Sequence, residues 1–232
     1  MIKFEITYYL CVEIRKMDPK EKDPGAEEKI KIAARKIFTR KGFAATRTRD
    51  IAEEAGLNLA LLNYYFRSKE KLFEIIMLEN FGQFLAGLRS ILHDTNTSLD
   101  QKIEGIVDFY ITQLSLSPDL PFFVLNELRS GSSILKDKGF SRDILLRSHF
   151  IQQLKEELHK RNIQHVNPLH YVMNIFSMTI FPFVAAPLIT EVGNLSEEDF
   201  GKLMQERKQW IPIWIKSILL AQPMNTSSPD NT

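Results

Sequence analysis

Thiol chemistry is almost absent from this 232-residue chain, which has a single cysteine, Cys11. One cysteine excludes an internal disulfide bond and any zinc site built from several cysteines, and it fits a reducing compartment, so we expect a cytoplasmic protein. The five histidines form no metal-ligand pattern such as H-x-x-x-H, and neither a glycine-rich phosphate loop nor a nucleophile elbow occurs. The sequence therefore predicts no metal, no cofactor and no catalytic residues.

Long uncharged apolar runs are also lacking. The nearest candidate, residues 172–192, is interrupted by Asn174, Pro182 and Pro187. A membrane span needs about 18 or more apolar residues, so a buried helix explains this segment better and we expect no membrane partner. Ten glycines and ten prolines are too few for a fibrous or disordered chain, and 44% hydrophobic with 25% charged residues is typical of a globular protein.

Charge is distributed unevenly, although the net charge is only +1. Residues 20–75 contain thirteen Lys/Arg and nine Asp/Glu, whereas residues 76–232 contain fourteen and seventeen. A basic first quarter on a slightly acidic remainder is the pattern expected of a segment that binds a polyanion.

A helix-turn-helix is the pattern that residues 24–66 predict. Apolar residues at three- and four-residue spacing between Ile30 and Phe38 form one helical face, which ends at Gly42. Thr48 is a candidate N-cap for a second, short helix, and Gly56 suits the sharp turn into a third helix at residues 59–66. Two short helices joined by a glycine-containing turn can place the second helix in the major groove of DNA.

Several motifs in this segment resemble the N-terminal domain of the TetR/AcrR family. They are Lys41-Gly42-Phe43, Thr48-Arg49-Asp50-Ile51-Ala52, Ala55-Gly56-Leu57 and Tyr65-Phe66-Arg67-Ser68-Lys69-Glu70-Lys71-Leu72, in matching order and spacing. The resemblance covers roughly a fifth of the chain. It implies an all-α fold with a three-helix DNA-binding head and a larger helical domain for ligand binding and dimerisation. Asn63 departs from the tyrosine that many family members carry in the recognition helix, so the base preference cannot be inferred.

Candidate phosphate contacts follow from helix position, exposure and the resemblance, and are Arg47, Thr48, Arg49, Tyr65, Lys69 and Lys71. Each also has a purely structural explanation, namely an N-cap for Thr48, a packing ring for Tyr65 and a solvated surface cation for the others. Candidate base contacts on the outer face of the third helix are Leu59, Ala60, Asn63 and Tyr64. Leu59 fits the core equally well.

The rest of the chain reads as a second helical unit. The pattern indicates a long helix through Leu92, a capping box at Ser98 and Gln101, and further helices including residues 142–160, about nine in the whole chain. Residues expected to line a ligand pocket are Phe84, Tyr110, Phe122, Phe123, Asn126, Asn174, Phe176 and Phe181, although most aromatic residues at helical spacing are simply core.

The last two helices are apolar around much of their circumference. The family resemblance implies that they pair with a second copy, so we expect a homodimer through residues 168–220, and a completed monomer core is the alternative. The expected divisions are an N-terminal extension at residues 1–22 that is disordered or not native, a DNA-binding domain at 23–67, a ligand-binding and dimerisation domain at 68–222, and a disordered tail at 223–232.

Function follows from the resemblance. It implies a transcriptional regulator that binds double-stranded DNA, most simply a repressor released from a two-fold symmetric operator by a small apolar inducer. The alternatives are a helical enzyme or a scaffold protein whose basic head does not bind DNA. Steeply salt-dependent binding to DNA would separate the first class from the other two.

Overall fold

The computed structural model describes residues 25–131, 133–137, 139, 141–163 and 165–220, and the regular elements in these residues are all α-helical. The described residues form twelve helical segments, α2 to α13, whereas the sequence predicts about nine helices in the whole chain. The expectations for residues 1–22 and 223–232 lie outside the described residues.

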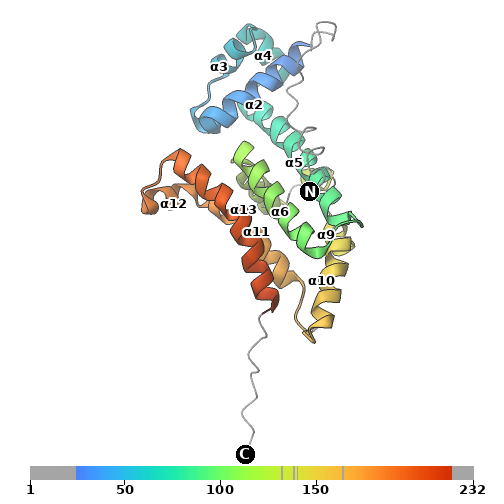
Figure 1. Ribbon diagram of the computed structural model, residues 1–232. Helices are drawn as coiled ribbons and strands as arrows, with labels where there is room; N and C mark the ends of the chain where they lie inside the picture. Colours follow the sequence, from blue (N-terminus) through green and yellow to red (C-terminus); the bar gives the residue numbers. More distant parts are fainter. Residues whose placement is uncertain (1–24, 132, 138, 140, 164, 221–232) are drawn as a thin grey trace, which may run out of the picture.

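Three helices form a head at one end of the molecule (Figure 1). They are α2 (Ala26–Ala45), α3 (Thr48–Glu54) and α4 (Leu59–Phe66). Their apolar faces meet in a small core in which each side chain is at most 3% exposed, made by Ile30, Ala34, Ile37, Phe38, Ile51, Ala52, Leu62 and Phe66. The spacing that predicts the helices therefore also supplies the core.

Gly42 interrupts α2 where the sequence predicts its end. Its backbone angles are φ 71° and ψ 166°, which are not helical, and the three residues after it form a separate turn. A residue with a Cβ is strained in this region, which is almost exclusively populated by glycine.

Gly42→Ala is therefore expected to lower the free energy of unfolding by about 1–3 kcal/mol. No neighbouring atom lies within 4 Å of the position of an added Cβ, so the cost is conformational and not steric. Chemical denaturation would measure it, with Gly25→Ala as the control, because Gly25 has a negative φ of −54° and the same open surroundings. Equal stability of the two variants would contradict the argument.

Helix α5 (Lys69–His93) joins the head to the rest of the chain. The Ser68 hydroxyl accepts a hydrogen bond from the Lys71 N–H at 3.1 Å and caps its first turn. The first half of α5 packs on α2 through the rings of Phe38, Phe43 and Phe73, and Glu79 pairs with both Lys31, at 3.0 Å, and Arg35.

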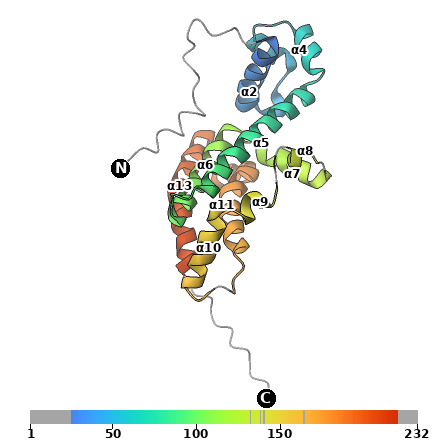
Figure 2. The same cartoon turned by 90° about the vertical axis from the view of Figure 1, so that its right-hand side faces the viewer.

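The larger helical unit, here called the body, packs around α6 (Leu99–Leu116) (Figures 1 and 2). Helices α10 (His149–Lys160), α11 (Leu169–Val184) and α13 (Glu197–Leu220) contact α6, and shorter segments complete the unit: α7 (Leu120–Ser130), α8 (Ile134–Asp137), α9 (Asp143–Leu146) and α12 (Ala186–Gly193). The predicted capping box of α6 is confirmed, with Ser98 N–H donating to Gln101 Oε1 at 2.9 Å and Gln101 N–H to Ser98 Oγ at 3.2 Å.

Two predicted helices are broken in the structure. The single helix predicted at residues 142–160 is wrong, because α9 ends at Leu146 and Ser148 is the N-cap of α10. The Ser148 hydroxyl donates to the Leu145 carbonyl at 2.6 Å and accepts from the Ile151 N–H at 3.2 Å. The apolar segment at 172–192, expected to be one buried helix, is divided at Ala185, and Pro187 lies in the first turn of α12. Pro182 and Pro212 lie inside α11 and α13.

Within the described residues, none of the helices alone has the length and apolar composition of a membrane span. Helices α11 and α12 meet those criteria only when taken together, as a pair bent by 71°.

Candidate nucleic-acid interface

Helix α4 has one face in the head core and one in solvent. Leu62 and Phe66 are 0% and 2% exposed, whereas Tyr64 is 78% exposed and Ala60 and Asn63 lie on the same open side. The Asn58 side chain caps the helix by accepting from the Leu61 N–H at 2.8 Å. Three of the four predicted base-contacting side chains are thus available to a ligand outside the head.

The fourth, Leu59, is half-buried and packs against the core. Its position allows both explanations that the sequence left open, since only part of the side chain remains at the surface. The turn before it is built as the sequence predicts: Gly56 has a φ of 66°, and the Leu57 N–H donates to the Ala52 carbonyl at 3.0 Å.

Arginines surround the start of α3 and the end of α4. Arg47, Arg49 and Arg67 are exposed, and none of them forms an ion pair within the described part of the chain. Thr48 is half-buried and begins α3, so its prediction as the N-cap is wrong: Arg47 occupies that position, and its N–H bonds to Asp50 Oδ2 at 3.3 Å. The Thr48 N–H still belongs to the positive end of the helix.

Acidic side chains in the head are held by lysines. Lys41 bonds to Asp50 at 2.8 Å, and this interaction, supported by the Arg47 N–H, lowers the pKa of Asp50. Lys36 bonds to Glu54 and lowers its pKa in the same way. These carboxylates are paired, so they weaken the positive potential of the arginines less than unpaired acids would.

Tyr65 and Lys71 lie near the same surface. Tyr65 is 41% exposed and its ring meets that of Tyr64 edge to face, with centroids 5.4 Å apart. Lys71 is exposed and pairs with Glu74 at 3.0 Å within one turn of α5. An exposed ion pair of this kind is weak, so the Lys71 ammonium can exchange Glu74 for a phosphate at little cost.

Lys69 has a different environment from the other candidate cations. Its ammonium donates to the carbonyls of Phe43 at 2.9 Å and Thr46 at 3.1 Å, and it lies 4.1 Å from the centre of the Phe43 ring. These contacts join the end of α2 to the start of α5. A phosphate contact by Lys69, which the resemblance implies, requires these bonds to be broken.

Arg67 is the exposed cation that the sequence reasoning missed. It caps α4 with φ 60°, a conformation that is uncommon for residues other than glycine and asparagine. Its position between two helices, directly after Phe66, could have indicated an exposed cation at the end of α4. Sequence alone does not show a positive φ at an arginine.

The residues predicted to line a ligand pocket separate into two groups. Phe84, Tyr110 and Phe176 come together in the body, with ring centroids 4.9 Å and 5.4 Å from that of Tyr110, and burial raises the pKa of the Tyr110 phenol. Phe123 and Asn174 are half-buried, whereas Phe122, Asn126 and Phe181 are exposed. The structure thus brings together three of the eight as a cluster.

Comparisons with known proteins agree with this architecture. The sequence model for "Bacterial regulatory proteins, tetR family" matches residues 32–76. The "Probable HTH-type transcriptional regulator YttP" of Bacillus subtilis is 26% identical over 197 residues, which cover 83% of this chain and 93% of that protein. The "HTH-type transcriptional repressor NicS" of Pseudomonas putida is 40% identical over 83 residues, 34% of this chain and 39% of that one.

A solved structure supports the fold over most of the chain. A TetR transcription regulator from Haloarcula marismortui matches with a TM-score of 0.54 at 14% identity, over 83% of this chain and 97% of that one. The family match falls on the helix-turn-helix described above, and the relatives are regulators and not enzymes. Residues 32–76 thus match the tetR family of bacterial regulatory proteins, and the chain is similar over most of its length to an HTH-type transcriptional regulator, which supports a DNA-binding transcriptional regulator of this type.

Proposed function

We propose that the protein is a homodimeric repressor that binds a two-fold symmetric operator and leaves it when a small apolar ligand enters the body. The outer face of α4 carries this proposal. It exposes an amide at Asn63, a methyl group at Ala60 and a phenol at Tyr64, on a helix whose opposite face is fixed in the head core.

Those groups suit the edges of base pairs. An asparagine amide can bond to both N6 and N7 of adenine, and an alanine methyl group can contact the methyl group of thymine. Arg47, Thr48 and Arg49 on one side, with Tyr65 and Lys71 on the other, are proposed to hold the flanking phosphates and so fix the register of α4 in the groove.

Dimerisation is supported by a second apolar face on α13. Ile211, Ile215 and Leu219 are at most 4% exposed, inside the body. Trp210 and Ile213 are each 51% exposed on another side of the same helix, and Trp210 stacks on Trp214 with centroids 6.3 Å apart. A helix with two apolar faces needs a partner for each.

The neighbouring helices α11 and α12 also carry exposed apolar side chains. Met173 and Phe181 of α11 are 55% and 59% exposed, and Leu188 and Val192 of α12 are 63% and 79% exposed. A second copy of the chain is the occupant we propose, through residues 168–220, because most soluble oligomers are two-fold symmetric and two heads are needed for a symmetric operator. The corresponding domains are residues 23–67 and 68–222.

The inducer is proposed to contact the ring cluster of Phe84, Tyr110 and Phe176. Tyr110 is only 6% exposed and carries the one hydroxyl group of this cluster. A mostly apolar ligand with one hydrogen-bonding group would therefore fit.

Selection of binding sites from random DNA, followed by titration at two salt concentrations, tests the DNA-binding part of the proposal. Asn63→Ala and Tyr64→Ala are expected to cost about 1–3 kcal/mol on the selected site and almost nothing on random DNA, because base contacts specify the sequence. Lys71→Ala is expected to weaken both alike and to lower the salt slope by about one unit, because a phosphate contact releases about one counterion.

Two results would contradict the proposal. If Asn63→Ala and Tyr64→Ala lose equal affinity for selected and random DNA, other residues contact the bases. A selected site without two-fold symmetry would exclude binding as a symmetric dimer. Ligand screening against the selected complex, read as release of DNA, tests the inducer.

A further inference from the structure

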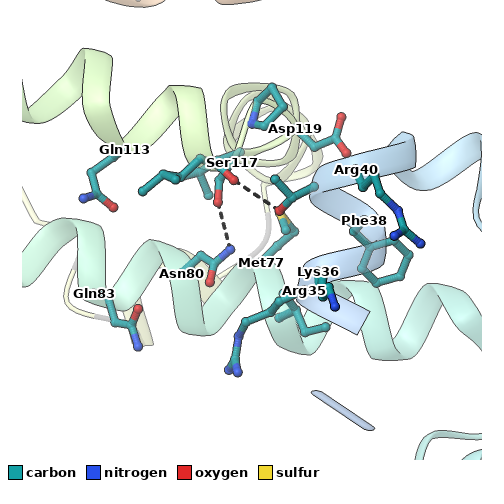
Figure 3. A pocket seen from close by; sticks show the side chains of 15 residues that line it. Arg35, Lys36, Phe38, Arg40, Met77, Asn80, Gln83, Gln113, Ser117 and Asp119 are labelled. Atoms are coloured by element: carbon teal, nitrogen blue, oxygen red, sulfur yellow. Dashed lines mark hydrogen bonds between the residues drawn. The ribbon is translucent and has the colours of Figure 1, made fainter. Parts of the chain in front are cut away.

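The turn between α6 and α7 touches the head directly. This α6–α7 turn, residues 116–119, lies against the end of α2, and together with α5 they enclose a cavity of about 440 Å³ (Figure 3). The Thr39 hydroxyl of α2 donates to the Leu116 carbonyl at 3.2 Å. The head is thus attached to the body at a second place besides its packing on α5.

A second contact comes from Asp119. Its half-buried carboxyl group lines the same cavity, and the Phe43 N–H opposes the rise that burial causes in the pKa of this group. Phe43 can offer its N–H because Gly42 interrupts α2 just before it. The Phe43 carbonyl also accepts a hydrogen bond from Lys69, and the Phe43 ring packs on Phe73. A contact at Phe43 is therefore connected to the packing between α2 and α5.

The turn itself is held in place. Asn80 of α5 donates to the Ser117 hydroxyl at 3.2 Å, as Figure 3 shows, and the Ser117 N–H donates to the Gln113 carbonyl at 2.9 Å. Pro118 restricts the backbone within it. Asp119 is the N-cap residue of α7, and α7 packs against α5 and α11, the helices that carry Phe84 and Phe176 of the proposed ligand cluster.

We infer that the α6–α7 turn is a positioning site for the head, and that Thr39 and Asp119 fix the orientation of α4 and with it the half-site spacing that the dimer reads. This inference rests on the proposed binding of a dimer to a two-fold operator. Neither Thr39 nor Asp119 is proposed to contact DNA. Their role is to hold the head at one angle, so that operators with another spacing are rejected.

The test uses the full chain and the selected operator, together with versions whose two half-sites are moved one base pair closer or further apart. The quantity measured is the ratio of affinities for the original and the altered spacing. Thr39→Val, which keeps the volume but removes the donor, is expected to lower this ratio by about three- to tenfold, the worth of one hydrogen bond. Asp119→Ala is expected to lower the ratio as well, because it removes a side chain of the turn that faces the head across the cavity. Thr39→Ser keeps the donor and is expected to retain the wild-type ratio.

Ser115→Ala is the matched control. The Ser115 hydroxyl donates to the Ile111 carbonyl at 2.8 Å, a similar bond that stays within α6 and does not reach the head. Thermal melting of each variant shows that it is folded, and general destabilisation would lower all affinities without changing their ratio.

An unchanged ratio in Thr39→Val and Asp119→Ala, or an equal decrease in Ser115→Ala, would overturn the inference alone. A wild-type protein that selects no paired half-sites would overturn the proposed function and the inference with it.

Discussion

Ile213→Glu and Trp214→Glu are expected to convert the proposed dimer to monomers and to lower operator affinity by about a hundredfold or more. The two side chains are 51% and 39% exposed on the open face of α13, where a carboxylate would be buried without a partner when a second chain covers it. Two linked heads bind an operator with an effective concentration that can raise affinity by about 10²–10⁴, and this gain is lost in a monomer. Sedimentation velocity gives the state of assembly, and titration of the selected operator gives the affinity.

Ile32→Glu is the control for assembly. Ile32 is 52% exposed on α2, so the substitution makes the same chemical change outside the proposed interface at residues 168–220. It is expected to leave the dimer intact. Dimers in both α13 variants would move the interface away from this face. Monomers in Ile32→Glu would show that added charge alone, and not the place of the residue, prevents assembly.

Leu62→Ala is expected to lower the free energy of unfolding of the head by about 2–5 kcal/mol, because Leu62 is 0% exposed and its removal leaves a cavity. A three-helix head has little stability to spare, so loss of protection from hydrogen exchange in α2 to α4 and loss of binding to every DNA sequence are expected together.

Asn63→Ala, at the next position, provides the comparison. Asn63 is exposed, so its substitution is expected to leave exchange in the head unchanged while affecting only the selected site. Normal protection of the head in Leu62→Ala would contradict the structure of its core. The two neighbouring variants thus separate the fold of α4 from its proposed recognition role.

Local patterns predicted much of the head. Gly56 was expected at the turn into α4, and the structure has it there with a φ of 66°. Directly after this turn, the Asn58 side chain caps α4 by accepting a hydrogen bond from the Leu61 N–H. Such signals are readable because each depends on one residue and its immediate neighbours in sequence. The alternation of buried and exposed residues in α4 follows from helical geometry in the same way.

Tertiary partners could not be predicted in that way. Lys69 looks like any exposed lysine in the sequence, and only the folded head shows the Phe43 and Thr46 carbonyls that hold it. Ser148 gave no signal of a break, because its hydroxyl bonds within its own region and leaves the apolar periodicity intact. The contact between Thr39 and Leu116 joins residues 77 positions apart, which no local pattern encodes.

The helices of the body were predicted, but not which of its apolar side chains are exposed. Phe122 and Phe181 fit an apolar stripe, yet the structure leaves them 46% and 59% exposed. Hydrophobic periodicity shows that a face is apolar, and it does not show whether the chain itself, a ligand or a second copy covers that face.

Helix α5 has a mechanical consequence. Its 25 residues extend for about 37 Å, at about 1.5 Å per residue, between the body and the head. A rotation of only about 5° at its body end would displace the far end by about 3 Å, close to the 3.4 Å rise of one base pair. The helix can act as a lever arm, so a small rotation at the body would be enough to move the heads of the proposed dimer out of register with DNA.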